Sequence, residues 1–144
     1  MTDPIFANTE KFQDPELTIR GEKRAKVALN QPETLWFNTG TLCNITCNNC
    51  YIESSPTNDA LVYLKSEEII PYLDQLKIRK WEVREIAFTG GEPFMNPQIL
   101  EMLTISLKRG YDVLVLTNAM QPMMRPFIKT GLINMSSCYI GCVS

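Results

Sequence analysis

Three short apolar runs, each followed by a segment with helix signals, constrain the fold of this chain more than any other feature. The runs Thr34–Asn38, Glu85–Thr89 and Asp112–Thr117 are typical of buried strands. Strands that alternate with helices are parallel and are joined by right-handed crossovers. We therefore expect an α/β fold, either an open parallel sheet or part of a barrel.

The segments between the runs carry recognisable helix boundaries. Ser66 is placed as the N-cap of a first helix. Asn96, followed by Pro97, predicts the start of a second helix, which Gly110 ends. A third helix, broken by proline, is predicted over 121–130.

Composition and charge limit the classes of protein to which this chain can belong. Residues 1–31 are polar, mixed in charge and without a persistent period, so we interpret them as an N-terminal extension with no assigned role, and 32–144 as the core domain. The net charge of −2 gives no basic field for nucleic acid or an anionic membrane surface. The sequence shows no membrane-length apolar run and no secretory signal, so we expect a cytoplasmic protein.

Five cysteines and no histidine narrow the chemistry. In a reducing compartment, thiols serve metal ligation, catalysis or burial rather than a disulfide framework. The lack of histidine removes the commonest general base and all imidazole metal ligands. Any reaction must then depend on thiolates, carboxylates, backbone dipoles or a borrowed cofactor.

Three of the cysteines lie in one loop directly after the first strand. Cys43, Cys47 and Cys50 are spaced so that their thiolates can wrap a single small cluster. Cubane iron–sulfur clusters normally take four thiolates, so three would leave one iron open to another ligand. A structural zinc site would want four ligands, usually arranged as two pairs. Zinc and buried free cysteine remain the alternatives at this point.

Two further turns are expected at the same edge of the sheet. In parallel α/β folds, ligands bind in the loops that follow the carboxyl ends of the strands. Thr89-Gly-Gly-Glu-Pro93 follows the second strand and Thr117-Asn118 follows the third. Paired glycines let the backbone approach a ligand closely. Taken alone, these segments are also consistent with an ordinary turn and a strand stop.

Together, the C-x-x-x-C-x-x-C triplet and the Gly-Gly-Glu-Pro turn resemble the radical S-adenosylmethionine (radical SAM) superfamily. The resemblance implies a partial (β/α) barrel, with about three N-terminal βα units of a TIM-like barrel. It also implies a [4Fe–4S] cluster, S-adenosylmethionine and an external electron donor. One electron from the cluster would cleave the cofactor to methionine and a 5′-deoxyadenosyl radical.

The resemblance also implies roles for individual residues. The cluster ligands would be Cys43, Cys47 and Cys50. The residues that bind the cofactor would be Gly90, Gly91, Glu92, Pro93 and Asn118. The turn would meet the methionyl ammonium chiefly through backbone carbonyls, with the proline fixing its shape.

One departure from the family pattern bears on the substrate. Many relatives have an aromatic residue just before the third cysteine, whereas here Asn49 stands there and Tyr51 follows. Relatives with this arrangement include enzymes that modify peptides or mature cofactors, so the departure is mild, and the resemblance suggests a peptide or a cofactor precursor as substrate. The alternative is a non-catalytic iron–sulfur or zinc-binding fragment that docks on a partner.

The length of the chain is the larger departure. Eight βα units take roughly 250 residues and six take roughly 190 on the same scale, more than the 144 residues here. We therefore expect a chain truncated before the later strands, whose open sheet edge favours self-association or a completing partner. In the tail, Cys138 and Cys142 are interpreted as extra cluster ligands or as small buried residues of a fourth strand.

Overall fold

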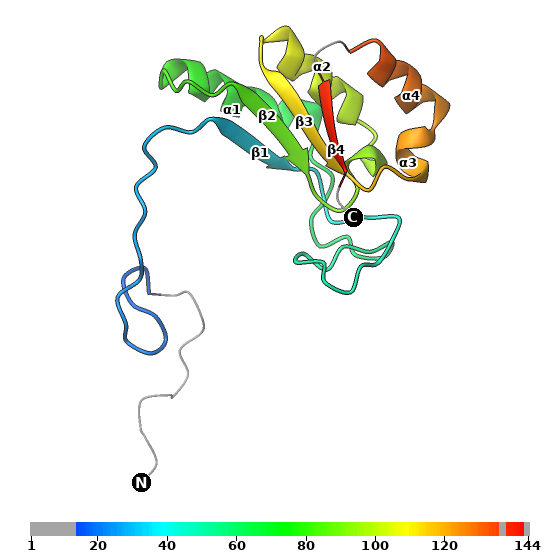
Figure 1. Cartoon of the computed structure of the whole chain (residues 1–144). Helices are drawn as coiled ribbons and strands as arrows, with labels where there is room; N and C mark the ends of the chain where they lie inside the picture. The colour runs from blue at the N-terminus through cyan, green and yellow to red at the C-terminus, as the bar shows by residue number, and fades with distance from the viewer. Residues whose placement is uncertain (1–13, 136–137, 143–144) are drawn as a thin grey trace. The chain divides into compact units, whose positions relative to one another are not determined.

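A computed structural model describes residues 14–135 and 138–142 of the chain. The chain divides into two compact units, residues 1–30 and residues 31–144. The larger unit contains all the helices and strands of the described part of the chain (Figure 1). In order, these are β1 (Thr34–Asn38), α1 (Ser66–Ile78), β2 (Glu85–Thr89), the 3₁₀ helix η1 (Pro93–Met95), α2 (Ile99–Lys108), β3 (Asp112–Thr117), α3 (Gln121–Met124), α4 (Pro126–Ile133) and β4 (Cys138–Cys142).

The strands form one parallel sheet in the order β1-β2-β3-β4. The three predicted strands are confirmed with their bounds unchanged, and β4 adds the fourth at the position expected in the tail. Strand order that follows chain order, with helices between the strands, is the arrangement of a partial α/β barrel. The side chains of β4, and so the roles weighed for its two cysteines, lie outside the described residues.

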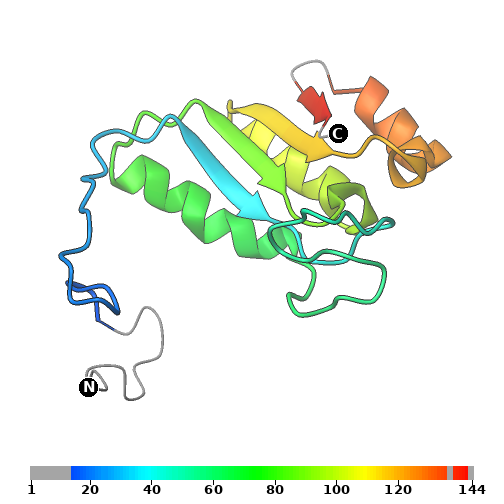
Figure 2. The same ribbon diagram turned by 60° about the horizontal axis from the view of Figure 1, so that its bottom comes forward.

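One face of the sheet carries the core. Phe37, Phe88 and Val115 lie in register on adjacent strands and are all buried. The helices α1 and α2 cover this face (Figure 2). The core that results also includes Ile69, Leu73, Leu76, Val83, Ile86, Phe94, Ile99, Met102, Leu103, Val113 and Ile128.

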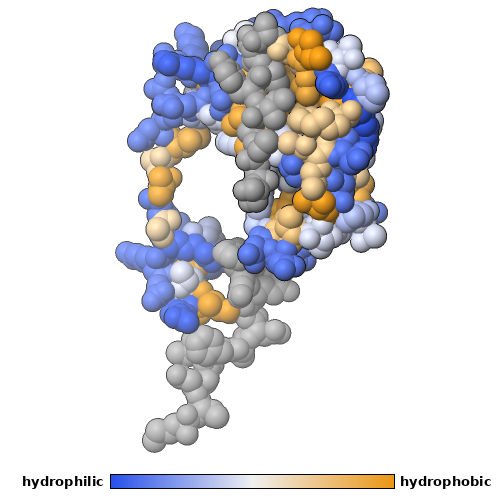
Figure 3. Space-filling model, turned by 45° about the vertical axis from the view of Figure 1, so that its right-hand side comes forward, coloured by the Kyte–Doolittle hydropathy of each residue, from blue (hydrophilic) through white to orange (hydrophobic). Residues whose placement is uncertain are grey.

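The opposite face of the sheet is less covered. In register on this face lie Trp36, which is 47% exposed, the small Ala87, and the half-buried Leu114. Large apolar side chains also reach the surface over α3 and α4, the side of the molecule that Figure 3 brings forward. The exposed ones there include Met124, Phe127 and Ile133. Self-association or a completing partner stays a prediction.

Two predicted helix starts were wrong by one to three residues, and both side chains also have partners far along the chain. The helix α1 begins at Ser66 itself, and Lys65 is its N-cap residue. The Ser66 hydroxyl instead donates to Glu101 on α2 at 2.8 Å. The helix α2 begins at Ile99, three residues after Asn96. The predicted end at Gly110 and the break in the third helix are confirmed.

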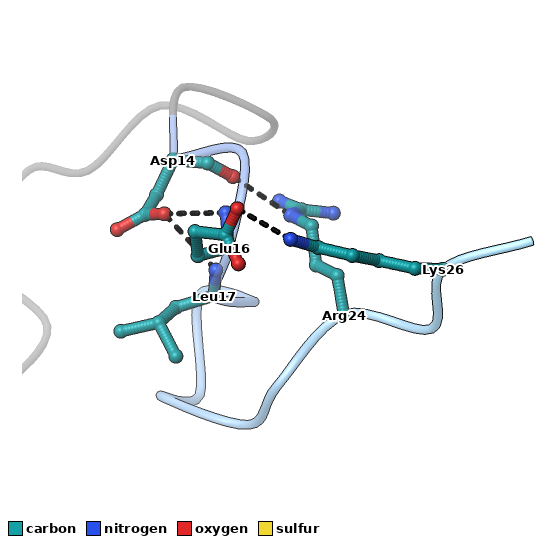
Figure 4. A network of polar contacts seen from close by, with 5 residues as sticks. All are labelled: Asp14, Glu16, Leu17, Arg24 and Lys26. Atoms are coloured by element: carbon teal, nitrogen blue, oxygen red, sulfur yellow. Dashed lines mark hydrogen bonds and ion pairs between the residues drawn. The ribbon is translucent and has the colours of Figure 1, made fainter.

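The smaller unit holds a tight turn that the sequence analysis did not predict. Leu17 pairs with Lys23 in an antiparallel bridge. The Asp14 carboxylate accepts hydrogen bonds from the backbone N–H groups of Glu16 and Leu17, at 2.7 and 3.0 Å (Figure 4). These bonds lower the pKa of the Asp14 carboxyl below its ordinary value. Local polar contacts, rather than an apolar period, hold this turn.

The helices in the described part of the chain are all too short or too polar to cross a membrane.

Candidate functional site

A cavity of about 350 Å³ lies at the carboxyl ends of β1, β2 and β3, where the loops after these strands meet. In Figure 1 the strand arrowheads point toward the teal loop that follows β1. Among the described residues, the cavity is lined by Cys43, Ile45, Cys47, Asn49, Cys50, Tyr51, Ser54, Thr89, Gly90, Gly91, Leu116, Thr117 and Asn118. A larger cavity of about 650 Å³ between α2 and α4 lies near the start of β3 and has no thiol among its described lining.

The long loop after β1 is closed at its base by one buried side chain. Asn96, 1% exposed, donates hydrogen bonds to the carbonyls of Thr39 and Leu64, at 3.1 and 2.8 Å. These two residues stand at the two ends of the loop, and the Leu64 N–H also donates a hydrogen bond to the Thr39 carbonyl. The sequence analysis missed this role, because the Asn-Pro pair was interpreted as a helix start. Asn96 therefore holds together the two ends of the cysteine loop, where the loop leaves β1 and where it leads into α1.

The three cysteines of the loop occupy different environments. Cys43 is buried, Cys50 is half-buried and Cys47 is exposed. Burial raises the pKa of the Cys43 thiol, and the nearby Glu92 charge adds to the rise. The Ser54 backbone N–H, 3.3 Å from the Cys50 sulfur, chiefly lowers the pKa of that thiol. No three side chains of the described residues converge closely enough to hold a single metal ion.

The two glycines after β2 are required by the cysteine loop itself. A Cβ on Gly91 would lie 2.2 Å from the carbonyl oxygen of Leu42, in the segment that leads to Cys43. The Gly91 N–H donates to Gly40 O at 2.8 Å, and the next N–H donates to Leu42 O at 3.0 Å. Gly90 has φ +148°, a conformation that L side chains rarely adopt. The turn therefore packs backbone to backbone against the loop while also lining the cavity.

The Glu92 carboxylate is buried within the fold as a hydrogen-bond acceptor and does not line the cavity. It is 1% exposed and accepts hydrogen bonds from the Phe94 and Asn118 backbones, at 3.0 and 2.9 Å. The Thr117 hydroxyl donates to both of its oxygens, at 2.8 and 2.9 Å. The side chains of Glu92 and Pro93 are thus placed behind the turn, whereas Gly90, Gly91 and Asn118 reach the cavity.

Ser54 is a second residue that the sequence analysis missed. It lines the cavity and is 4% exposed, and its hydroxyl has no well-aligned hydrogen-bond partner among the described residues, although it lies near enough to the Cys50 sulfur to help lower the pKa of that thiol. A buried hydroxyl without a partner costs on the order of 1–3 kcal/mol. An acceptor bound in the cavity would remove that cost. A single serine in a polar loop carries no signal by which the sequence could have singled it out.

Comparison with known proteins gives a consistent result. The model of the radical SAM superfamily matches residues 37–136. A GTP 3′,8-cyclase of Chlorobaculum tepidum is 34% identical over 52% of this chain and 22% of its own length. The antilisterial bacteriocin subtilosin biosynthesis protein AlbA of Bacillus subtilis is 40% identical over 53% of this chain and 16% of its own.

Solved structures agree on the fold. Streptococcus suis SuiB bound to S-adenosylmethionine superposes with a TM-score of 0.63 at 18% identity, over 76% of this chain and 24% of SuiB. SuiB bound to its precursor peptide SuiA gives a TM-score of 0.62. The chain thus spans about a fifth of the length of the curated relatives it matches. The superfamily uses a [4Fe–4S] cluster and S-adenosylmethionine as its cofactors, and because the family match covers the greater part of the chain, this protein belongs to the radical SAM superfamily.

Proposed function

We propose that this chain forms the cofactor-binding part of a radical SAM enzyme, with Cys43, Cys47 and Cys50 as the ligands of its [4Fe–4S] cluster. The observation that carries the proposal is the cavity at the carboxyl ends of β1 to β3. Three thiols and the Gly90-Gly91 turn line it together, although they come from loops that follow different strands.

The residues around the cavity fit the group. Thiolates are the ligands that iron–sulfur clusters require, and three of them leave one iron free for S-adenosylmethionine. The buried Ser54 hydroxyl lies beside the Cys50 sulfur and has no well-aligned acceptor among the described residues. Each iron of a cubane takes its own thiolate, so three thiols that line one cavity without meeting at a single metal ion are consistent with a cluster.

When bound, the reduced cluster supplies the electron that cleaves S-adenosylmethionine to methionine and a 5′-deoxyadenosyl radical. The chain's own contribution is binding, orientation and exclusion of side reactions. No described residue donates a hydrogen bond to the carbonyls of Gly90 or Gly91. These carbonyls are therefore free to accept from the methionyl ammonium, while Glu92 and Pro93 hold the turn in shape from behind.

A peptide is the substrate class we propose. AlbA is named for the biosynthesis of a bacteriocin, and SuiB is seen with a precursor peptide. Tyr51, next to the third cysteine, is 80% exposed at the rim of the cavity and available to a substrate. The similarity to GTP 3′,8-cyclases keeps a nucleotide as the competing class.

The first experiment is anaerobic reconstitution with iron and sulfide. We expect about four irons per chain. Alanine at Cys43, Cys47 or Cys50 should abolish the cluster, whereas Cys138→Ala and Cys142→Ala serve as matched controls and should retain it. If a tail variant loses iron as completely as Cys47→Ala does, the ligand assignment is wrong.

The second experiment separates an enzyme from a binding module. Reconstituted protein is reduced with dithionite and assayed for 5′-deoxyadenosine from S-adenosylmethionine. We expect production above that of Cys47→Ala. A full cluster without any cleavage would support the alternative, a non-catalytic iron–sulfur module that docks on a partner. Supplying candidate peptides or GTP, and measuring which one increases the yield, decides the substrate class.

A further inference from the structure

Asn118, the first residue after β3, holds its side-chain amide in a fixed orientation beside the cysteine loop. Its Nδ2 donates to the Oδ1 of Asn44 at 2.9 Å and lies 3.8 Å from the sulfur of Cys43. Its Oδ1 accepts from the backbone N–H of Met120 at 3.0 Å. The amide is held from both ends, so its N–H groups face the loop.

The backbone of Asn118 is anchored just as firmly. Its N–H donates to the buried Glu92 carboxylate at 2.9 Å, and the Thr117 hydroxyl donates to the same carboxylate. The Ala119 N–H donates back to the Thr117 hydroxyl at 3.0 Å. A chain of hydrogen bonds thus runs from the turn after β2, through Glu92, to the amide beside Cys43.

The sulfurs of the three cysteines differ in the donors that face them. The Cys43 sulfur faces the Asn118 amide and the loop's own backbone N–H groups at Asn44 and Ile45, whereas the donors at the Cys50 sulfur all belong to the loop, chiefly the Ser54 backbone N–H. The exposed Cys47 has no hydrogen-bond donor to its sulfur among the described residues. Of these side chains and backbone groups, the Asn118 amide alone comes from outside the cysteine loop and acts on its buried ligand.

We propose that Asn118 donates an N–H···S hydrogen bond to Cys43 as a cluster ligand and thereby raises the reduction potential of the cluster, with Glu92 as its positioning residue. This inference rests on the proposed function. Reduction adds negative charge to a cluster and its thiolates, and a donor aimed at a sulfur stabilises that added charge. Burial of Cys43 strengthens the effect, because a hydrogen bond is electrostatically stronger where the local dielectric is low.

The test is Asn118→Leu, which removes the amide at similar volume, with Asn49→Leu as the matched control. Asn49 lines the same cavity, but no hydrogen bond joins its side chain to a cysteine sulfur. Both reconstituted variants are titrated against mediators, and the reduced cluster is followed by electron paramagnetic resonance. We expect the equilibrium constant for reduction of Asn118→Leu to fall about tenfold, a shift of about 59 mV to lower potential for one electron. The control should keep the wild-type potential.

A second variant tests the role of Asn118 in case the Asn118→Leu protein assembles no cluster. Thr117→Val removes one donor from Glu92 but leaves the Asn118 amide in the protein, so we expect a smaller shift in the same direction. A purely structural role for this turn would lower iron content without moving the potential of the clusters that do form.

The possible failures are distinguishable. If the wild-type protein assembles no cluster, the proposed function is wrong. If Asn118→Leu carries a full cluster at the wild-type potential, or Asn49→Leu shifts the potential as far, only the role of Asn118 is refuted. That role is likewise refuted if Thr117→Val, with its cluster intact, leaves the potential unmoved.

Discussion

Replacing Gly91 with alanine should separate the cysteine loop from the turn after β2. The added Cβ would lie 2.2 Å from Leu42 O and 2.7 Å from Thr41 O, both backbone atoms that cannot rotate away. Relief requires the loop to move outward by about 1 Å, since carbon and oxygen pack at roughly 3 Å or more. The main-chain bonds from Gly91 and Glu92 to Gly40 and Leu42 would then be lost.

The cost can be estimated from these contacts. Two backbone hydrogen bonds contribute about 0.5–1.5 kcal/mol each. Forcing extra volume into a packed site costs about 1–3 kcal/mol. We therefore expect Gly91→Ala to lower the free energy of unfolding by about 2–6 kcal/mol, and to reduce iron incorporation because the displaced segment leads directly to Cys43.

Gly110→Ala provides the matched control. At Gly110 a Cβ would meet nothing within 4 Å, but φ is +87°. This substitution introduces backbone strain alone, worth about 1–2 kcal/mol, and it lies far from the loop in sequence. Urea unfolding followed by circular dichroism, together with iron analysis after reconstitution, measures both effects. The reasoning is refuted if Gly91→Ala is as stable as Gly110→Ala, or if it retains the full iron content.

Three further substitutions or titrations test other parts of the structure. Ala119 has φ +54°, so Ala119→Gly should raise the free energy of unfolding by up to about 1 kcal/mol, whereas Ala60→Gly, at an exposed position with ordinary φ, should lower it slightly in the same urea assay. Asn96→Ala removes the hydrogen bonds to two loop carbonyls, of which Thr39 O keeps the Leu64 N–H, so the free energy of unfolding should fall by about 2 kcal/mol, and iron content should fall with it. Asp14 has a lowered pKa in the folded turn, so its contribution is present above the ordinary pKa and is lost as the pH falls through the folded value; an NMR titration midpoint at or above about 3.9 would contradict this.

Local patterns were sufficient to predict the strands and the convergence of their loops. Each strand is a continuous apolar run, and parallel topology then places the three following loops at one edge without any knowledge of contacts. The residues of the cysteine loop and of the Gly90-Gly91 turn could for that reason be assigned to one region before the structure was known.

The exact helix starts could not be predicted, because the side chains that signal them also have distant partners. Ser66 and Asn96 are both good N-cap residues by local chemistry. In the fold, however, the Ser66 hydroxyl donates to Glu101, and the Asn96 NH₂ group donates to Thr39 and Leu64 while its Oδ1 accepts from the Gln98 N–H. Partners 25 to 57 residues distant, such as those of Glu92 and Asn96, leave no trace in a local pattern.

The same distinction explains how the Gly-Gly-Glu-Pro turn can hold the fold together and also take the cofactor-binding role that we propose for it. Gly91 is small because the Leu42 carbonyl lies against it, and Glu92 is acidic because the Thr117 hydroxyl and Asn118 N–H donate to it. Both requirements come from packing and hydrogen bonds within the protein itself, independently of any cofactor. The Gly91 and Glu92 N–H groups and the carboxylate are committed to the fold, whereas no described residue donates to the carbonyls of Gly90 and Gly91, and these are the acceptors that the proposed ammonium group would need. Under the proposed function, the part of the turn that would bind the cofactor is thus the part that the fold leaves without a hydrogen-bond partner.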